Sequence, residues 1–159
     1  MANIRRWYIY IVCTVSLQVA AWSLVSLLKS IILGDFDKKA TASGIALCLV
    51  GFIVFLIHWL WARRLASGSD EERGALVRRL YLVTNMSVFL LAVIFTFIDL
   101  IAGLLGELFA SHFEGFRLLS YGEVLLVPLA TILVSGLLWF YHNRIKIEES
   151  AAIMKSGSW

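Results

Sequence analysis

Long apolar runs, almost free of charge, alternate with short charged segments along the 159-residue chain. Each run reaches or approaches the roughly 20 residues that a helix needs to cross a hydrocarbon core about 30 Å thick. Strand-like alternation of apolar and polar positions is absent, and an open sheet edge cannot be satisfied in lipid. The pattern therefore predicts an all-α polytopic membrane protein with four transmembrane helices, over residues 7–33, 44–61, 80–109 and 124–141.

The composition indicates the same class, since 60% of the residues are hydrophobic, 16% are charged and the mean hydropathy is +0.85. The first run follows Arg5 and Arg6 and contains the small residues Val19–Ala21, as a secretory signal would. It is longer than the apolar stretch of about 7 to 15 residues in such signals, so we expect a retained helix. Cys13 and Cys48 fall at different depths of the first two spans, which argues against a disulfide.

The basic residues predict an orientation. Ten of the 14 lysines and arginines lie in the N-terminal segment, the central connection and the C-terminal tail. By the positive-inside rule, both termini and the central connection are then cytoplasmic. The formal net charge of +3 reflects this orientation, and we expect membrane lipid rather than nucleic acid as a partner.

The central connection is the most highly charged segment of the chain. Ser69 and Glu72 have the spacing of a capping box, which predicts that the third helix begins near Asp70 and continues unbroken into the membrane. Charges at this density are typical of a solvated surface rather than of a catalytic cluster. We expect a cytoplasmic docking surface made by Arg63, Arg64, Asp70, Glu71, Glu72, Arg73, Arg78 and Arg79.

The two halves of the chain form a tandem repeat. A shift of 73 residues aligns 4–36 with 77–109 without a gap, matching the Arg-Arg-x-Tyr entrances at Arg5 and Arg78. The following helices align at a shift of 80, which pairs Trp59 with Trp139. This predicts a four-helix bundle of two tandem parallel helical hairpins, over 4–65 and 69–147, in a single membrane domain with a short cytoplasmic tail at 148–159.

Asp99 is an ionisable residue within the third predicted span, where charge is costly. The repeat places it at nearly the same depth as Lys29, given a rise of about 1.5 Å per residue. We expect a Lys29–Asp99 ion pair that ties the first helix to the third. A proton or ion relay is the alternative, although no further polar stations are evident along the predicted spans.

His58 and His142 lie near the cytoplasmic ends of the second and fourth predicted helices. Two facing histidines are able to hold a haem, and one is able to ligate the magnesium of a chlorophyll-type pigment. Histidines at a membrane interface are more often ordinary polar side chains. We therefore expect no cofactor and no metal, and keep tetrapyrrole ligation as an alternative.

Catalytic motifs are absent from the sequence, which has no Gly-rich phosphate loop, metal-ligand spacing or nucleophile–base set. We expect a protein that is not an enzyme. The leading interpretation is an accessory, assembly or structural subunit of a larger respiratory or photosynthetic membrane complex, with other membrane protein subunits or itself as partners. The alternatives are a small oligomeric transporter or channel and a haem- or pigment-binding electron-transfer subunit.

Two segments carry a family resemblance, HWLWARRLASGSDEERGALVRRLY at 58–81 and RRWYIYIVCTVSLQVAAWSLVSLLKSI at 5–31. They resemble the bacterial membrane proteins of domain-of-unknown-function family 5671, in which an Arg-Arg-x-Tyr helix, a His-Trp-x-Trp-Ala-x-Arg helix end and a Glu-Glu-Arg linker recur. The resemblance covers about the first hundred residues well and the last third loosely. It implies a four-helix inner-membrane protein and brings no activity and no catalytic residues.

Overall fold

The computed structural model describes residues 2–68, 70–114 and 121–156, and within these ranges it contains helices and no strand. The all-α prediction is confirmed. Four of the helices are long and apolar enough to cross a membrane. The elements, in chain order, are α1 (Ala2–Leu33), α2 (Lys38–Gly68), α3 (Asp70–Arg73), α4 (Leu76–Glu114), the π-helical turn η1 (Gly122–Leu126) and α5 (Val127–Ser156).

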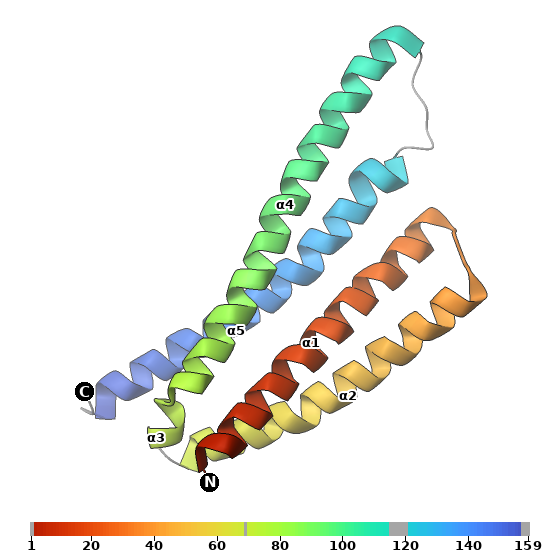
Figure 1. The fold of residues 1–159 in the computed structure, drawn as a ribbon. Helices are drawn as coiled ribbons and strands as arrows, with labels where there is room; N and C mark the ends of the chain where they lie inside the picture. Colours follow the sequence, from red (N-terminus) through yellow and green to blue (C-terminus); the bar gives the residue numbers. More distant parts are fainter. Residues whose placement is uncertain (1, 69, 115–120, 157–159) are drawn as a thin grey trace.

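Neighbouring helices in the chain pack along each other (Figure 1). α1 packs along α2, α4 packs along α5, and α1 also contacts both α4 and α5. Both ends of the described chain and the short helix α3 lie at one end of the molecule, and the turn between α1 and α2 lies at the other. The central connection therefore shares one end with the two termini, as the charge distribution predicted.

The turn between α1 and α2 follows from its residues. Gly34 has a φ of 67°, in the left-handed region that glycine enters without steric cost. Asp37 then caps α2, because its Oδ1 accepts the backbone N–H of Ala40 at 2.7 Å. The sequence thus ends one long helix and starts the next within four residues.

The prediction that one helix runs unbroken from Asp70 into the apolar run was wrong. α3 ends at Arg73, and α4 starts anew at Leu76, with the Ala75 carbonyl accepting the N–H of Arg78 at 3.1 Å. Gly74 stands at the break, and glycine is about 1 kcal/mol worse than alanine inside a helix. Ser69, the expected cap, lies outside the described residues.

The π-helical turn η1 precedes the only proline of the chain, Pro128. Proline has no N–H, and its ring clashes with the carbonyl four residues earlier, here that of Val124. The wider turn absorbs this conflict, and the Val127 N–H bonds to the Gly122 carbonyl five residues back. α5 then continues to Ser156, through most of the segment expected to be a tail.

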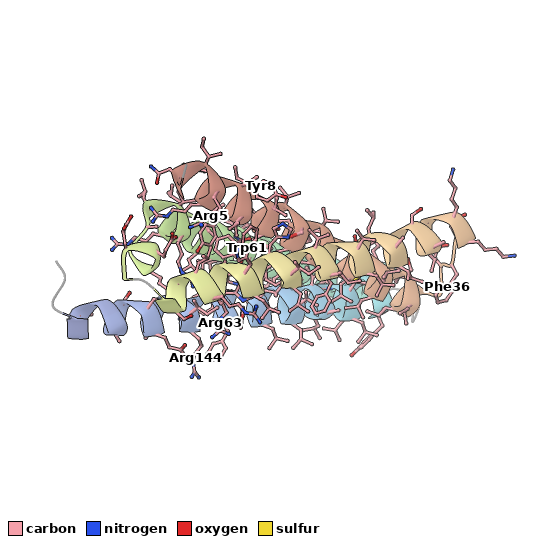
Figure 2. The ribbon with its side chains drawn as sticks, turned by 90° about the horizontal axis from the view of Figure 1, so that it is seen from below. Arg5, Tyr8, Phe36, Trp61, Arg63 and Arg144 are labelled. Atoms are coloured by element: carbon pink, nitrogen blue, oxygen red, sulfur yellow. The ribbon has the colours of Figure 1, made fainter. Side chains whose placement is uncertain are left out.

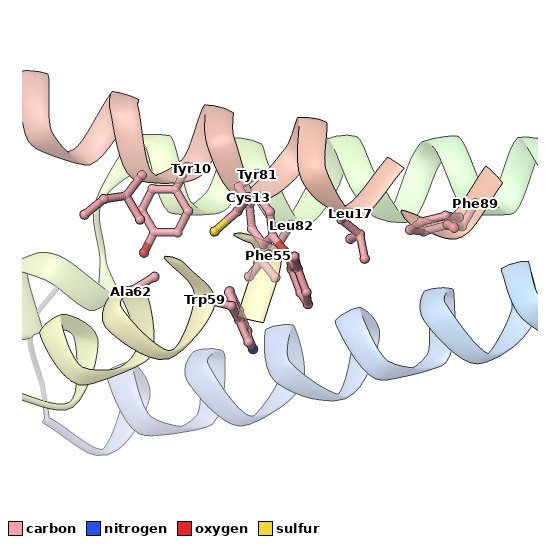
Figure 3. Packing of buried hydrophobic residues seen from close by; sticks show 11 residues of the cluster. Tyr10, Cys13, Leu17, Phe55, Trp59, Ala62, Tyr81, Leu82 and Phe89 are labelled. Carbon is pink, nitrogen blue, oxygen red and sulfur yellow. The ribbon is translucent and has the colours of Figure 1, made fainter. Parts of the chain in front are cut away.

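The core lies in the half of the molecule that contains both termini, since most of its residues come from the N-terminal halves of α1 and α4 and the C-terminal half of α2. Figure 3 shows how these buried side chains pack. Helices α1 and α2 approach closely along it, since a Cβ on Gly51 would lie 3.0 Å from the Ser16 carbonyl oxygen. Both cysteines are free, as predicted. The buried cluster consists of Ile9, Tyr10, Cys13, Leu17, Ala21, Phe55, Trp59, Ala62, Tyr81, Leu82 and Phe89.

Candidate functional site: a buried polar cluster

Helix α4 carries a stripe of polar side chains into the core. Arg78, Tyr81 and Asn85 recur at helical spacing on one face, and they are 2%, 3% and 0% exposed. Leu82 and Phe89 extend the same buried face with apolar side chains. Buried polar groups need hydrogen-bond partners, so the partners of this stripe define the site.

Arg78 is bound on three sides. Its Nε donates to both carboxylate oxygens of Glu149, at 2.9 and 3.0 Å, and its Nη2 also donates to Glu149. Its Nη1 donates to the hydroxyl of Tyr10 at 2.7 Å and to the carbonyl of Ala62 at 3.5 Å. The guanidinium carbon lies 5.4 Å from the ring centroid of Trp59. Arg78 thus connects α1, α2 and α5 to α4 through one side chain.

His142 is fully buried, and both of its ring nitrogens have partners. Its Nδ1 lies 2.8 Å from the Leu138 carbonyl, which only accepts, so Nδ1 carries the proton. The neutral ring therefore presents Nε2 as an acceptor to the Tyr81 hydroxyl at 3.1 Å. Aromatic rings of Trp59 and Phe89 lie 6.4 and 6.2 Å from the imidazole centroid. The ring is held inside an aromatic enclosure.

A chain of amides lies deeper in the bundle. The Gln18 Nε2 donates to the Asn85 Oδ1 at 3.0 Å, and Asn85 donates to the Tyr81 carbonyl at 2.9 Å. The indole of Trp22 donates to the Gln18 Oε1 at 2.9 Å. These bonds tie α1 to α4, and within the described residues no buried side-chain nitrogen or oxygen lacks a partner.

The N-terminus is attached to α3 by ion pairs. Arg6 binds Glu72 and Glu71, each at 2.9 Å, and Arg5 binds Glu72 at 3.1 Å. The hydrogen bond from Arg6 is the main reason why the pKa of the Glu72 carboxyl lies below its ordinary value, and the charges of Arg6 and Arg5 act in the same direction. Partial burial of Glu72 opposes this shift without cancelling it.

An open pocket of about 250 Å³ lies beside the Arg78–Glu149 pair. Its lining comes from α2, α4 and α5, and the polar lining residues are Arg63, Ser67, Arg78, Glu148 and Glu149. The labelled Arg63 and Arg144 lie at the same end of the molecule, opposite Phe36 (Figure 2). The polar cluster is therefore reachable from the end that contains both termini.

Only some of the residues of the expected docking surface are exposed. Arg78 is buried in the core, so its placement on that surface was wrong. The Glu72 side chain is 13% exposed and bound by two arginines. Arg63, Arg64, Glu71 and Arg79 are exposed, as expected. The side chains of Asp70 and Arg73 lie outside what the structure describes.

The structure does not bring Lys29 and Asp99 together. Both side chains are exposed, and neither takes part in an ion pair with any residue that the structure describes. The π-helical turn lies between the two helix ends, because Gly122 packs near Leu33 of α1 and Val124 packs near Gly103 of α4. Because η1 separates the two helix ends, the expected ion pair between Lys29 and Asp99 does not form.

His58 and His142 face different partners. The His58 ring lies 5.8 Å from the Tyr8 ring, and its Nδ1 bonds to the Val54 carbonyl at 2.9 Å. His142 pairs with Tyr81, the repeat equivalent of Tyr8. Each half of the chain thus pairs the tyrosine of its Arg-Arg-x-Tyr entrance with a histidine of the next long helix. A ligand at His142 has to displace the Tyr81 hydroxyl.

Sequence reasoning missed most of the polar cluster. The expectation that no further polar stations follow along the spans was wrong, because Asn85 and Gln18 lie buried or half-buried between α1 and α4. The spacing of Arg78, Tyr81 and Asn85 on one helical face was a usable signal. Glu149 gave no such signal, since it lies in a segment expected to be a solvated tail.

Comparison with known proteins identifies a family for this chain. A family model described as "Domain of unknown function (DUF5671)" matches residues 6–137, from the first turns of α1 through α2, α3, α4 and η1 to the first part of α5. The match extends beyond the first hundred residues, where the sequence resemblance was clearest. No curated protein and no solved structure matches the chain.

Proposed function

Since the chain belongs to the DUF5671 family, as its helix-end motifs predicted, and the family carries no assigned activity, we propose its function from its own geometry. The protein is a non-catalytic integral membrane protein that serves as an accessory or assembly subunit of a larger membrane complex, respiratory or photosynthetic. Its partners are other membrane protein subunits or further copies of itself. The family description neither supports nor opposes this role.

The proposal places four helices across a bacterial inner membrane, as two tandem hairpins with both termini in the cytoplasm. Its support is the combination of four apolar helices of 30 to 34 residues with a charge distribution that favours one end. The contacts of α1 with α2 and of α4 with α5 fit two hairpins. The shared end of the termini and α3 fits an even number of crossings.

The accessory role is supported chiefly by the buried polar groups, which form hydrogen bonds between helices. Arg78 binds Glu149, Asn85 binds Gln18, and the Tyr81 hydroxyl binds His142, so each bond connects two different helices. Side chains engaged in this way hold a bundle together and offer no free nucleophile or base. The chemistry of the cluster is therefore that of a scaffold.

Large apolar faces remain for contacts with lipid or other helices. Leu133 and Leu137 on α5 are 63% and 61% exposed, and Val50 on α2 is 61% exposed. In lipid, helices associate through close packing and hydrogen bonds rather than through the hydrophobic effect. The exposed charges at the cytoplasmic end then determine which partner binds, through electrostatic complementarity. Arg63, Arg64 and Arg79 are among these charges.

Native purification in mild detergent tests the accessory role. The chain should co-purify with a defined set of membrane proteins. The paired change Arg64→Glu and Arg79→Glu should reduce the recovery of those partners, because both side chains are exposed and neither takes part in the hydrogen bonds of the buried cluster that the structure describes. Ser150→Ala, on the exposed face of α5, is the matched control and should leave recovery unchanged. Recovery of the chain only as a free monomer would overturn the role.

A small oligomeric transporter or channel is the second candidate, favoured by the amide pair of Asn85 and Gln18 between the apolar helices α1 and α4. Polar side chains at such depth often mark ion or substrate paths. Ion flux in liposomes tests it with two variants. A transporter should lose flux with Asn85→Leu or Asp99→Asn while the bundle stays folded, whereas wild-type liposomes without flux would exclude this candidate.

The proposal includes no bound cofactor. Its support is that both ring nitrogens of His142 already have protein partners and that His58 faces Tyr8. The visible absorbance spectrum of protein purified from its native membrane tests this directly. A tetrapyrrole spectrum that disappears with His142→Ala or His58→Ala would replace the accessory role with an electron-transfer role.

A further inference from the structure

The open pocket beside Arg78 has walls of opposite charge. On the α2 side it is lined by Arg63 and Ser67, and on the α5 side by Glu148 and Glu149. Arg78 also lines the pocket, and its charge is neutralised by its ion pair with Glu149. A ligand in this pocket meets a cationic wall and an anionic wall across a space of about 250 Å³.

The cationic wall carries a guanidinium group that no described residue neutralises, that of Arg63. Arg63 is exposed, and it forms no ion pair with any residue that the structure describes. On the opposite wall, the one ion pair of Glu148 among the described side chains is a long contact of 3.7 Å with Arg144, in which both side chains are 64% exposed. Such an exposed ion pair contributes about 1 kcal/mol or less to stability. Glu148 can therefore exchange Arg144 for a cation that binds it at a shorter distance.

The pocket lies at the level expected for lipid headgroups. Exposed aromatic side chains stand within about one helical turn of its lining residues, Trp61 beside Arg63 on α2 and Tyr141 beside Ile145 on α5. Exposed tryptophan and tyrosine rings favour the boundary between hydrocarbon and water. The same pocket also has apolar lining atoms, from Ala66 and Ile145.

We propose that this pocket binds the zwitterionic headgroup of a cytoplasmic-leaflet phospholipid that carries a primary amine, the phosphoethanolamine type. The phosphate lies against Arg63 and Ser67, and the ammonium lies against Glu148, beside the Arg78–Glu149 pair. A primary ammonium supplies three N–H donors to the glutamates, which a trimethylammonium group lacks. This inference rests on the proposed membrane insertion with the termini in the cytoplasm.

Lipid binding to the delipidated full chain, measured by native mass spectrometry, tests the site. Phosphatidylethanolamine should bind about tenfold more tightly than phosphatidylcholine, which has no ammonium N–H, and than phosphatidylglycerol, which has no cation; tenfold corresponds to about 1.4 kcal/mol. Equal binding of the three lipids would overturn the proposal. If soluble phosphoethanolamine binds as tightly as phosphatidylethanolamine, the claim that the ligand is a membrane lipid would be wrong.

Two variants test the contribution of each wall to lipid binding separately. Arg63→Gln should weaken the binding of both phosphatidylethanolamine and phosphatidylglycerol, because both contain the phosphate. Glu148→Gln should weaken only phosphatidylethanolamine. Arg64→Gln is the matched control, since Arg64 is exposed next to Arg63 but does not line the pocket. If Arg64→Gln has the same effect as Arg63→Gln, general surface charge explains the binding and the site is refuted. Because this experiment uses the purified chain alone, its failure leaves the accessory role to be judged by co-purification.

Discussion

Arg78 and Glu149, 71 residues apart in the chain, form a two-pronged ion pair at 2.9 and 3.0 Å that ties the start of α4 to the last part of α5. The arginine is almost completely buried, and Tyr10 and Ala62 bind it from the other two long helices. A buried arginine at a helix entrance needs its carboxylate, because an unpaired buried charge is far more costly than a paired one.

Replacement of one partner of this pair should therefore be strongly destabilising. We expect Glu149→Gln to lower the free energy of unfolding by about 3 kcal/mol, the lower end for a broken buried pair because Glu149 is partly exposed. Arg79→Gln, at the exposed neighbouring position, should change it by less than about 0.5 kcal/mol. Denaturant unfolding in detergent micelles measures both, and equal effects would contradict the assigned role of Arg78.

The Asn85–Gln18 bond gives a smaller expected effect. Asn85→Leu should destabilise the bundle by about 1 kcal/mol, since hydrogen bonds between helices in membranes contribute about this much or less. The double variant Asn85→Leu and Gln18→Leu should cost less than the sum of the two single changes, because it leaves neither amide facing the apolar replacement of the other. Additive costs in this double-mutant cycle would show that the two amides do not interact.

The Tyr81 hydroxyl is the only side-chain donor that the described structure shows at the His142 Nε2. Tyr81→Phe leaves that nitrogen unsatisfied in a fully buried ring, so we expect a loss of about 1 to 2 kcal/mol in the free energy of unfolding. Tyr8→Phe is the control at the repeat-equivalent position, where the tyrosine is exposed. A change at Tyr8 as large as that at Tyr81 would contradict the buried hydrogen bond.

The attachment of the N-terminus to α3 should depend on pH. The pKa of Glu72 is lowered in the folded state, chiefly by the hydrogen bond from Arg6. Its contribution to stability is therefore complete above the ordinary glutamate pKa of about 4.3, and it is lost as the pH falls through the lowered folded value. The thermal midpoint of the wild type should fall more steeply than that of Glu72→Gln below about pH 4.3. Parallel curves would show that Glu72 is not the titrating group.

The proposed orientation is tested by labelling of single cysteines in intact cells. In a Cys48→Ala background, where the remaining native thiol of Cys13 is buried, Asp35→Cys should react with an impermeant maleimide added outside. Ser67→Cys should react only after the cells are permeabilised. The opposite pattern would reverse the orientation and remove the basis of the proposed lipid site.

The apolar runs defined the four long helices, but not their ends. The runs predicted 44–61 and 124–141, whereas α2 spans Lys38–Gly68 and α5 continues to Ser156. Polar residues at helix ends still form backbone hydrogen bonds, and hydropathy does not register this. The break at Gly74 was equally hidden, because Glu71, Glu72 and Arg73 directly before it have good helix propensity.

The sequence by itself determined the class of the protein, its four long apolar helices, its family and the end at which positive charge gathers. These follow from composition and spacing, which are properties of each segment alone. Only the tertiary structure decided that Arg78 is buried against Glu149, that Asn85 meets Gln18, and that Lys29 and Asp99 stay apart. Such partners depend on helix rotation and axial register, and one residue of slip turns a side chain by about 100° and moves it about 1.5 Å. Packing between distant segments sets both quantities, and no local pattern encodes them.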